Sequence, residues 1–110
     1  MITARFKRKH ESIICFNISG HAGYADSGFD IVCSAVSSIS CAIANGITEV
    51  LYIEPEIVVN ENDGLINLDL SKNSKEEIEK SQVLMKTMLL GIKSIEQMYG
   101  DYIKVIEEEV

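Results

Sequence analysis

The stretch that sets the fold is residues 2–19, ITARFKRKHESIICFNIS, in which apolar and polar side chains alternate along two runs. The apolar positions on one face are Ile2, Ala4 and Phe6 in the first run, then Ile14, Phe16 and Ile18 in the second. Alternation of this kind is typical of half-buried strands. The polar residues Arg8 to Glu11 connect the runs, so the stretch predicts a hairpin whose second strand is Ser12–Ser19.

A loop and a helix follow this hairpin. Gly20 to Asp30 contains three glycines, two aspartates and a serine, a composition that predicts a mobile loop. Apolar residues then recur at helical spacing, which predicts a largely buried helix whose end is marked by Pro55. The stripe comprises Val32, Ala35, Val36, Ile39, Ala42, Ile43, Gly46, Ile47 and Val50.

The second half of the chain repeats the order of hairpin and helix. Ile57–Val59 and Leu65–Leu70 predict two strands joined by the turn-forming residues Asn60 to Gly64. Ser74 and Glu77 form the pattern of a capping box at a helix start, and Gly100 predicts its end. The expected inward residues of this helix are Ile78, Met85, Met88, Leu89, Ile92 and Ile95. Residues 101–106 predict a last strand.

Together these elements predict an α+β fold in one domain spanning residues 1–110. The order is β-β-α-β-β-α-β, and the natural packing is a mainly antiparallel sheet with two helices on one face. A chain of 110 residues is too short for two independent cores.

The composition of the chain limits which classes of partner we expect. The net charge is −7 and there is no tryptophan, which argues against direct binding of nucleic acid and suits a positively charged partner. No stretch approaches the ~20 apolar residues of a membrane span, so no membrane partner is expected. The first residues lack the apolar core of a signal peptide, and the three cysteines are odd in number, so we expect cytoplasmic thiols.

One pair of residues has a chemically useful arrangement. His21 follows a strand end and Cys33 opens a helix, with the glycine-rich loop between them. The partial positive charge of a helix start and a nearby imidazolium both favour a thiolate, the nucleophilic form of cysteine. The amides of Cys33 or Ser34, with one from the turn Gly20–Gly23, are the expected donors to an oxyanion.

Structural explanations compete with these roles. A buried cysteine at a helix start is about as frequent as a reactive one, and a histidine at a strand end is usually a surface residue. Cys15 and Cys41 are better explained by packing, and His10 by solvation in a turn. The spacing of two histidines and three cysteines indicates no zinc site, and no cofactor is expected.

Two further side chains have alternative roles. Asp30 either caps the helix through the amides of Val32 or Cys33, or orients His21 as a third catalytic group. Ser37 lies one turn beyond Cys33, where it either bonds to the helix backbone or lines the site.

The stretch from Gly20-His21-Ala22-Gly23 to Gly28-Phe29-Asp30-Ile31-Val32-Cys33-Ser34-Ala35-Val36-Ser37 resembles the ribosomal-processing cysteine protease family, Prp. The family pattern is a Gly-His-Ala turn, a glycine-containing loop, then Gly-x-Asp-x-Val-Cys-x-Ala-Val-Ser. Every fixed position is present, and the resemblance covers essentially the whole chain. Ser34 stands where alanine is common.

The resemblance implies a cytoplasmic endopeptidase with a dyad of Cys33 as nucleophile and His21 as general base. Asp30, Ser37, Gly20 and Ser34 would support this dyad. The implied substrate is a basic protein, large-subunit ribosomal protein twenty-seven, whose N-terminal extension is cut off after aromatic residues for ribosome assembly. The resemblance also implies a homodimer and a loop that moves when substrate binds.

Two other functions remain open from the sequence. A non-catalytic ribosome-assembly partner would hold a basic ribosomal protein on its acidic surface. A thioesterase or acyl-transfer enzyme would use the same dyad on a small substrate.

Overall fold

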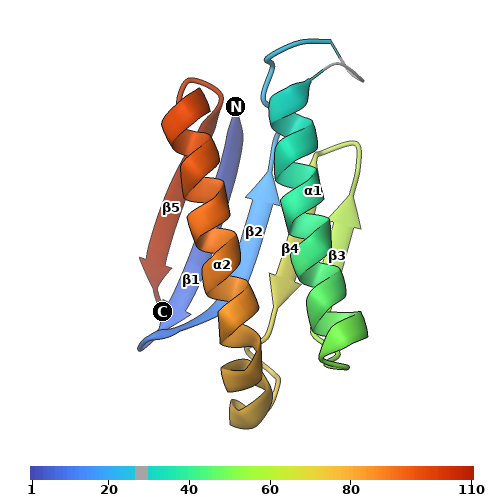
Figure 1. The fold of residues 1–110 in the computed structure, drawn as a ribbon, viewed down its shortest axis with the longest axis vertical. Helices are drawn as coiled ribbons and strands as arrows, with labels where there is room; N and C mark the ends of the chain where they lie inside the picture. The colour runs from blue at the N-terminus through green and yellow to red at the C-terminus, as the bar shows by residue number, and fades with distance from the viewer. Residues whose placement is uncertain (27–29) are drawn as a thin grey trace.

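A computed structural model describes residues 1–26 and 30–110 as two helices packed on one face of a five-stranded sheet (Figure 1). The strands are β1 (Ile2–Lys9), β2 (Ser12–Ser19), β3 (Glu56–Asn60), β4 (Leu65–Asp69) and β5 (Ile103–Glu109). The helices are α1 (Ile31–Asn45), which continues into the π-helical turn η1 (Gly46–Val50), and α2 (Lys75–Tyr99). The predicted fold class and element order are therefore confirmed.

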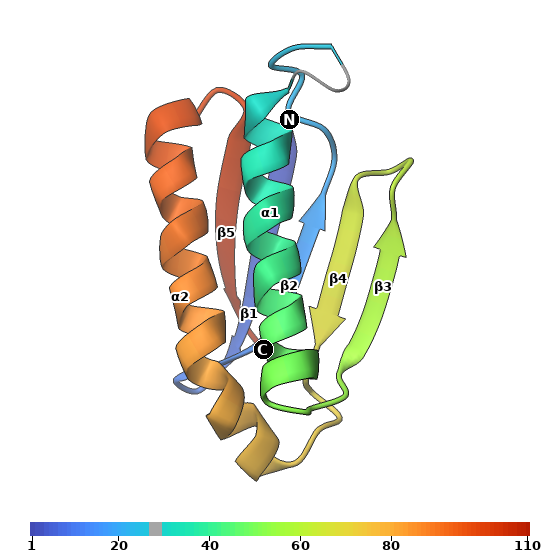
Figure 2. The same ribbon diagram turned by 45° about the vertical axis from the view of Figure 1, so that its right-hand side comes forward.

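The sheet is mixed, with the order β3-β4-β2-β1-β5. All pairs are antiparallel except β1 with β5, which run parallel because α2 carries the chain back between β4 and β5. Opposite residues such as Phe6 and Phe16 share the face that the helices cover, and both side chains are fully buried. The β3–β4 hairpin stands beside α1 at the other edge of the sheet (Figure 2).

The two helices differ in how well they follow the predictions. For α2, the capping box of Ser74 and Glu77 is present, Gly100 caps the end, and five of the six expected inward residues are buried. Gly100 has φ −60°, so the helix ends without the left-handed residue that the glycine suggested.

The prediction of a largely buried α1 was wrong in part. Its stripe of buried residues faces the sheet and α2, but Ser34, Ser37, Ser38 and Cys41 are exposed on the opposite face. The helical turns end at Val50, five residues before Pro55, and Tyr52 then adopts a positive φ of 56°. The close contact of α1 is with α2, where a Cβ on Gly91 would lie 3.4 Å from Ile39.

By length and composition, the segment Ile31–Val50 meets the requirements of a membrane-spanning helix, contrary to the expectation from the sequence. Such a match is weak evidence, because core helices pass the same test. Val32, Val36 and Ile47 on this segment are among the most buried residues of the core. This packing accounts for the buried share of the segment, which is 33% of its most apolar window.

The prediction that the last strand ends at residue 106 was wrong, because β5 runs through Glu109. The acidic residues at its end pair in register with the basic end of β1. Arg5 bonds to Glu108 at 2.8 Å, and Arg8 bonds to Glu107 through Nη2 at 3.1 Å. The charge of Arg5 and Arg8 is therefore partly neutralised by β5.

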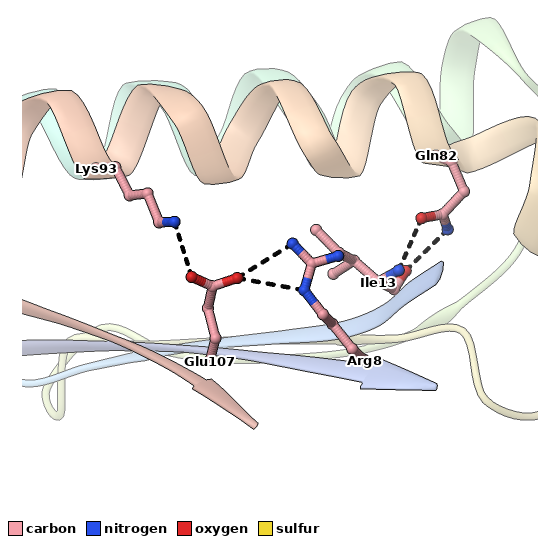
Figure 3. A network of polar contacts seen from close by, with 5 residues as sticks. All are labelled: Arg8, Ile13, Gln82, Lys93 and Glu107. Atoms are coloured by element: carbon pink, nitrogen blue, oxygen red, sulfur yellow. Dashed lines mark hydrogen bonds and ion pairs between the residues drawn. The ribbon is translucent and has the colours of Figure 1, made fainter. Parts of the chain in front are cut away.

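Glu107 also connects the sheet to α2 (Figure 3). Its Oε2 lies 2.7 Å from Lys93 Nζ on α2, while its Oε1 accepts from Arg8 on β1. A second link joins Gln82 on α2 to both main-chain polar groups of Ile13, at 2.7 and 2.9 Å. The hydrogen bond from Lys93, followed by that from Arg8, holds the pKa of Glu107 below its usual range despite partial burial, which raises it.

We expect Glu107→Gln to lower the free energy of unfolding at pH 7 by at most about 1 kcal/mol, because the pair is partly solvated. The pKa of Glu107 is lowered in the folded state, so its contribution is present above the unfolded pKa and disappears as pH falls through the folded value. Urea unfolding from pH 7 to 3 measures this, with Glu109→Gln at an exposed site of the same strand as control. A difference that persisted at pH 3 would contradict the assignment.

Candidate active site

The turn after β2 brings His21 to the edge of the sheet. Gly20 has φ +91°, and a Cβ on it would lie 2.5 Å from Met1 O, so only glycine fits this approach to β1. Its amide donates to Asp63 O in the β3–β4 turn at 3.1 Å. These contacts fix the point where the chain leaves the sheet and place His21 between the two hairpins.

Cys33 lies in the first turn of α1 and is partly exposed. Its Sγ accepts a hydrogen bond from the main-chain N–H of Ala22 at 3.3 Å. The turn that carries His21 is thus directly joined to the sulfur of Cys33. A donated N–H stabilises negative charge on a sulfur that it faces.

A cavity of about 380 Å³ contains both residues of the predicted dyad. One wall is formed by α1 and the other by the β3–β4 hairpin. Its polar and reactive lining includes Gly20, His21, Cys33, Ser37, Ser40, Cys41 and Glu61, and its apolar lining includes Ile2, Ile18, Val36, Val59, Leu65 and Ile66. The cavity is therefore apolar along most of its walls, with the sulfur and the imidazole at one end.

The imidazole of His21 is exposed and bonds elsewhere. Its Nε2 lies 3.0 Å from the main-chain oxygen of Asn62 in the β3–β4 turn. Over residues 1–26 and 30–110 we find no hydrogen bond between His21 and Cys33. The structure brings the two residues to one cavity, where the imidazole bonds to the β3–β4 turn and not to the sulfur.

Asp30 acts as the cap of α1. Its Oδ1 accepts from the amides of Val32 and Cys33, both at 3.0 Å, and its Oδ2 accepts from the amide of Tyr24 at 3.1 Å. Of the two roles considered for Asp30, the geometry supports capping, since the ring of His21 bonds to Asn62 instead. Burial raises the pKa of Asp30, but donation from the Cys33 and Tyr24 amides outweighs it, and the net pKa is lowered.

The predicted oxyanion donors at the helix start are already occupied in this structure. The amide of Cys33 donates to Asp30 Oδ1, and the amide of Ser34 donates to the main-chain oxygen of Asp30 at 3.0 Å. The prediction offered the Cys33 amide both to an oxyanion and to the cap by Asp30, and in this structure the cap holds it. In the Gly20–Gly23 turn, the Ala22 N–H donates to Cys33 Sγ, and its predicted role toward an oxyanion stays a prediction.

Some of the remaining candidate site residues lie at the cavity and others lie away from it. Ser37 lines the cavity, while Ser34 is exposed beside it. Cys15 is buried behind Asn67, and burial, followed by the charge of Asp69, raises the pKa of its thiol. His10 is exposed in the β1–β2 turn, as expected. Cys41 differs from expectation because it is exposed and lines the cavity rather than packing in the core.

Sequence reasoning missed the contacts that hold the residues after His21. The ring of Tyr24 packs edge-on against Tyr99 and Tyr102, with centroid distances of 5.8 and 5.1 Å. These two tyrosines flank the turn from α2 to β5. The predicted mobile loop is thus anchored at Tyr24, and residues 27–29 of that prediction lie outside the described part of the chain.

We expect Asp30→Ala to lower the free energy of unfolding by about 0.5–2 kcal/mol, the usual cost of losing a cap. Asp30→Asn retains an acceptor for the amides, so at pH 7 it should cost less. Because the folded pKa of Asp30 is lowered, its charge-dependent stabilisation exists above the unfolded pKa and is lost as pH falls through the folded value. Urea unfolding at pH 7 and pH 3 tests this; equal stability of all three proteins would refute the capping role.

Comparison with known proteins agrees with this site. The sequence matches the family described as cysteine protease Prp over residues 1–104. This chain belongs to that family. Among Prp relatives, the ribosomal processing cysteine protease Prp of Bacillus subtilis is 29% identical over 107 residues, covering 96% of each chain. The Prp of Staphylococcus aureus is 27% identical over 88 residues, 80% of each chain.

Solved structures give the same fold for the Prp family. The crystal structure of SMU.848 from Streptococcus mutans has a TM-score of 0.88 at 31% identity, covering 100% of this chain and 96% of its own. Prp from S. aureus, solved in complex with a covalently linked product peptide, has a TM-score of 0.84 at 24% identity, covering 98% of this chain and all of its own. The five-stranded sheet with two helices is therefore shared with these two solved structures.

Proposed function

We propose that this chain is an endopeptidase that removes the N-terminal extension of large-subunit ribosomal protein twenty-seven, cutting after aromatic residues. The observation that carries the proposal is that His21 and Cys33 line one cavity, at the point where a strand end meets a helix start. Membership of a cysteine protease family supports the reaction type. The names of the B. subtilis and S. aureus relatives support a ribosomal substrate.

Cys33 is the nucleophile and His21 the general base in this mechanism. The thiol proton passes to His21 as sulfur attacks the peptide carbonyl, and His21 returns it to the leaving amine. Water then hydrolyses the thioester, with His21 accepting its proton. The S. aureus relative with a covalently linked product peptide supports a covalent intermediate.

The supporting residues shape this site rather than react. Gly20 holds the turn that carries His21, and Asp30 holds the start of α1 under Cys33. Ser37 and Ser34 lie on the helix face next to the sulfur. The Ala22 N–H donates to Cys33 Sγ at 3.3 Å, so it would serve the oxyanion once the sulfur is bonded to the carbonyl carbon and no longer holds this hydrogen bond.

The charge and shape of the cavity fit an extended basic protein segment. Glu61 lies on the wall opposite Cys33, and the chain carries a net charge of −7. The apolar walls suit the aromatic side chains that precede the expected cut. We place this reaction in the cytoplasm and expect a homodimer with no direct contact to nucleic acid or membrane; exposed Val83, Leu90 and Met98 on the outer side of α2 suit contact with a second copy.

The direct test is to incubate the protein with extended ribosomal protein twenty-seven and identify the products by mass spectrometry. We expect a single cut after an aromatic residue in the extension. Binding without a cut would contradict the proposal and favour an assembly partner. Turnover of a small thioester in place of the protein would point to an acyl-transfer enzyme.

A further inference from the structure

The bond between His21 and the β3–β4 turn determines which ring nitrogen carries the proton. The Nε2 atom lies 3.0 Å from the main-chain oxygen of Asn62. A carbonyl oxygen only accepts hydrogen bonds, so Nε2 must donate and hold a hydrogen. In the neutral ring, Nδ1 is then the unprotonated nitrogen and the one able to accept a proton.

We propose that the main-chain carbonyl of Asn62 is the positioning group of the general base, and that Nδ1 of His21 is the atom that takes the proton of Cys33. This inference rests on the proposed function and adds the group that orients the base. In other catalytic sites a side chain oxygen bonded to the second ring nitrogen fixes the tautomer and the ring orientation. Here a turn 41 residues away in sequence supplies that oxygen from its backbone.

The turn has its own bonds that hold the carbonyl in place. Asn60 Oδ1 accepts from the amides of Asn62 and Asp63 at 3.1 and 3.4 Å, and Asn60 Nδ2 donates to Asp63 Oδ2 at 3.0 Å. Asp63 O in turn accepts from the amide of Gly20 at 3.1 Å. The Asn60 side chain therefore fixes the conformation of a turn that is itself bonded to the residue before His21.

Gly64 allows this turn to approach the histidine closely. Its φ is +58°, and a Cβ on it would overlap Gly20 O and lie 3.1 Å from Cε1 of His21. A larger residue would push the turn away from both. The sequence Asn60 to Gly64 thus meets two needs at once, since it closes a hairpin and brings a carbonyl to the imidazole.

The proton balance of the reaction is consistent with this arrangement. Nδ1 accepts the thiol proton as the bond from sulfur to carbonyl carbon forms, and both ring nitrogens are then protonated. Nε2–H still donates to Asn62 O, so this bond is retained by the imidazolium and becomes stronger as the ring gains charge. Nδ1–H then protonates the leaving amine, which restores the neutral ring.

The test is nitrogen NMR of the protein with ¹⁵N-labelled histidine, at a pH high enough that both imidazole rings are neutral. We expect His21 to be entirely in the Nε2–H form, whereas His10, exposed in the β1–β2 turn, reports the mixture of an unconstrained ring. Asn60→Ala should shift His21 toward the mixture of His10. It should also lower kcat on an extension peptide by about 10- to 100-fold with little change in KM, because the base is misplaced rather than the substrate.

Two further variants keep the result interpretable. The double variant Asn60→Asp with Asp63→Asn exchanges the donor and the acceptor of the bond between these two side chains and keeps an acceptor oxygen for the amides of residues 62 and 63, so it should preserve the tautomer of His21. Asn73→Ala removes the bonds of Asn73 to Glu54 O and Glu77 Oε1 before α2, and should leave both the tautomer and kcat unchanged.

The outcomes separate this inference from the proposed function. A His21 ring in the Nδ1–H form, or one with the same mixture as His10, overturns the inference even if the protein cleaves its substrate. An unchanged tautomer and kcat in Asn60→Ala also overturns it. An Nε2–H ring that relaxes in Asn60→Ala, in a protein that never cleaves the extension, supports the positioning by Asn62 and overturns the proposed function.

Discussion

Replacing Cys33 by alanine is expected to lower kcat for extension cleavage by about 10⁴-fold or more, since removal of a nucleophile leaves only substrate binding and oxyanion contacts. The fold should be retained. Cys33 is only partly buried, and the change removes one bond from the Ala22 amide to sulfur. We therefore expect the free energy of unfolding to change by no more than about 1 kcal/mol. Cleavage is followed by mass spectrometry of the peptide products.

Ser38→Ala is the matched control for this variant. Ser38 lies on the exposed face of α1, does not line the cavity, and has a side chain of similar size. It should cleave at the wild-type rate. If Cys33→Ala retains more than a small fraction of that rate, the nucleophile is another group.

Much of the fold was predictable because local patterns and tertiary packing agree. The alternation in residues 2–19 matched the observed hairpin, and Ser74 with Glu77 located the start of α2. The end of β5 was not predictable from local pattern, because Glu107, Glu108 and Glu109 have low strand preference. Their place in the sheet depends on the basic end of β1, nearly 100 residues earlier.

In the candidate site too, features set by local sequence were predictable and features set by tertiary packing were not. That Cys33 and His21 lie in one cavity was predictable because a helix start and a strand end are local features, and the cap by Asp30 is also local. The oxyanion prediction was wrong at Cys33 and Ser34 because capping and catalysis compete for the same amides. The bond from His21 to Asn62 had no sequence signal, since any residue supplies a main-chain carbonyl. Only the packing of two hairpins brings it there.

Replacing His21 by alanine should lower kcat by about 10²- to 10⁴-fold, the range for losing a general base. It should also slow the alkylation of Cys33 by iodoacetamide at neutral pH, because the imidazole no longer stabilises the thiolate. The rate at Cys33 is followed by peptide mass spectrometry, with the exposed thiol of Cys41 in the same protein as an internal reference. His10→Ala, in the turn between β1 and β2, is the matched control and should change neither quantity.

The two readouts of His21→Ala separate two ways in which an imidazole can help a sulfur. If alkylation slows together with cleavage, His21 assists the thiolate before substrate arrives, which requires the ring to reach Cys33 in the free protein. If cleavage falls while alkylation keeps its rate, the Ala22 N–H and the helix start suffice to ionise the sulfur. His21 would then act only on the leaving amine and on water, and the inference that Nδ1 takes the proton of Cys33 would be overturned. In the described part of the chain, His21 and Cys33 share no hydrogen bond. Slower alkylation in His21→Ala would therefore show that the ring of the free wild-type protein turns toward the sulfur while Nε2 keeps its bond to Asn62.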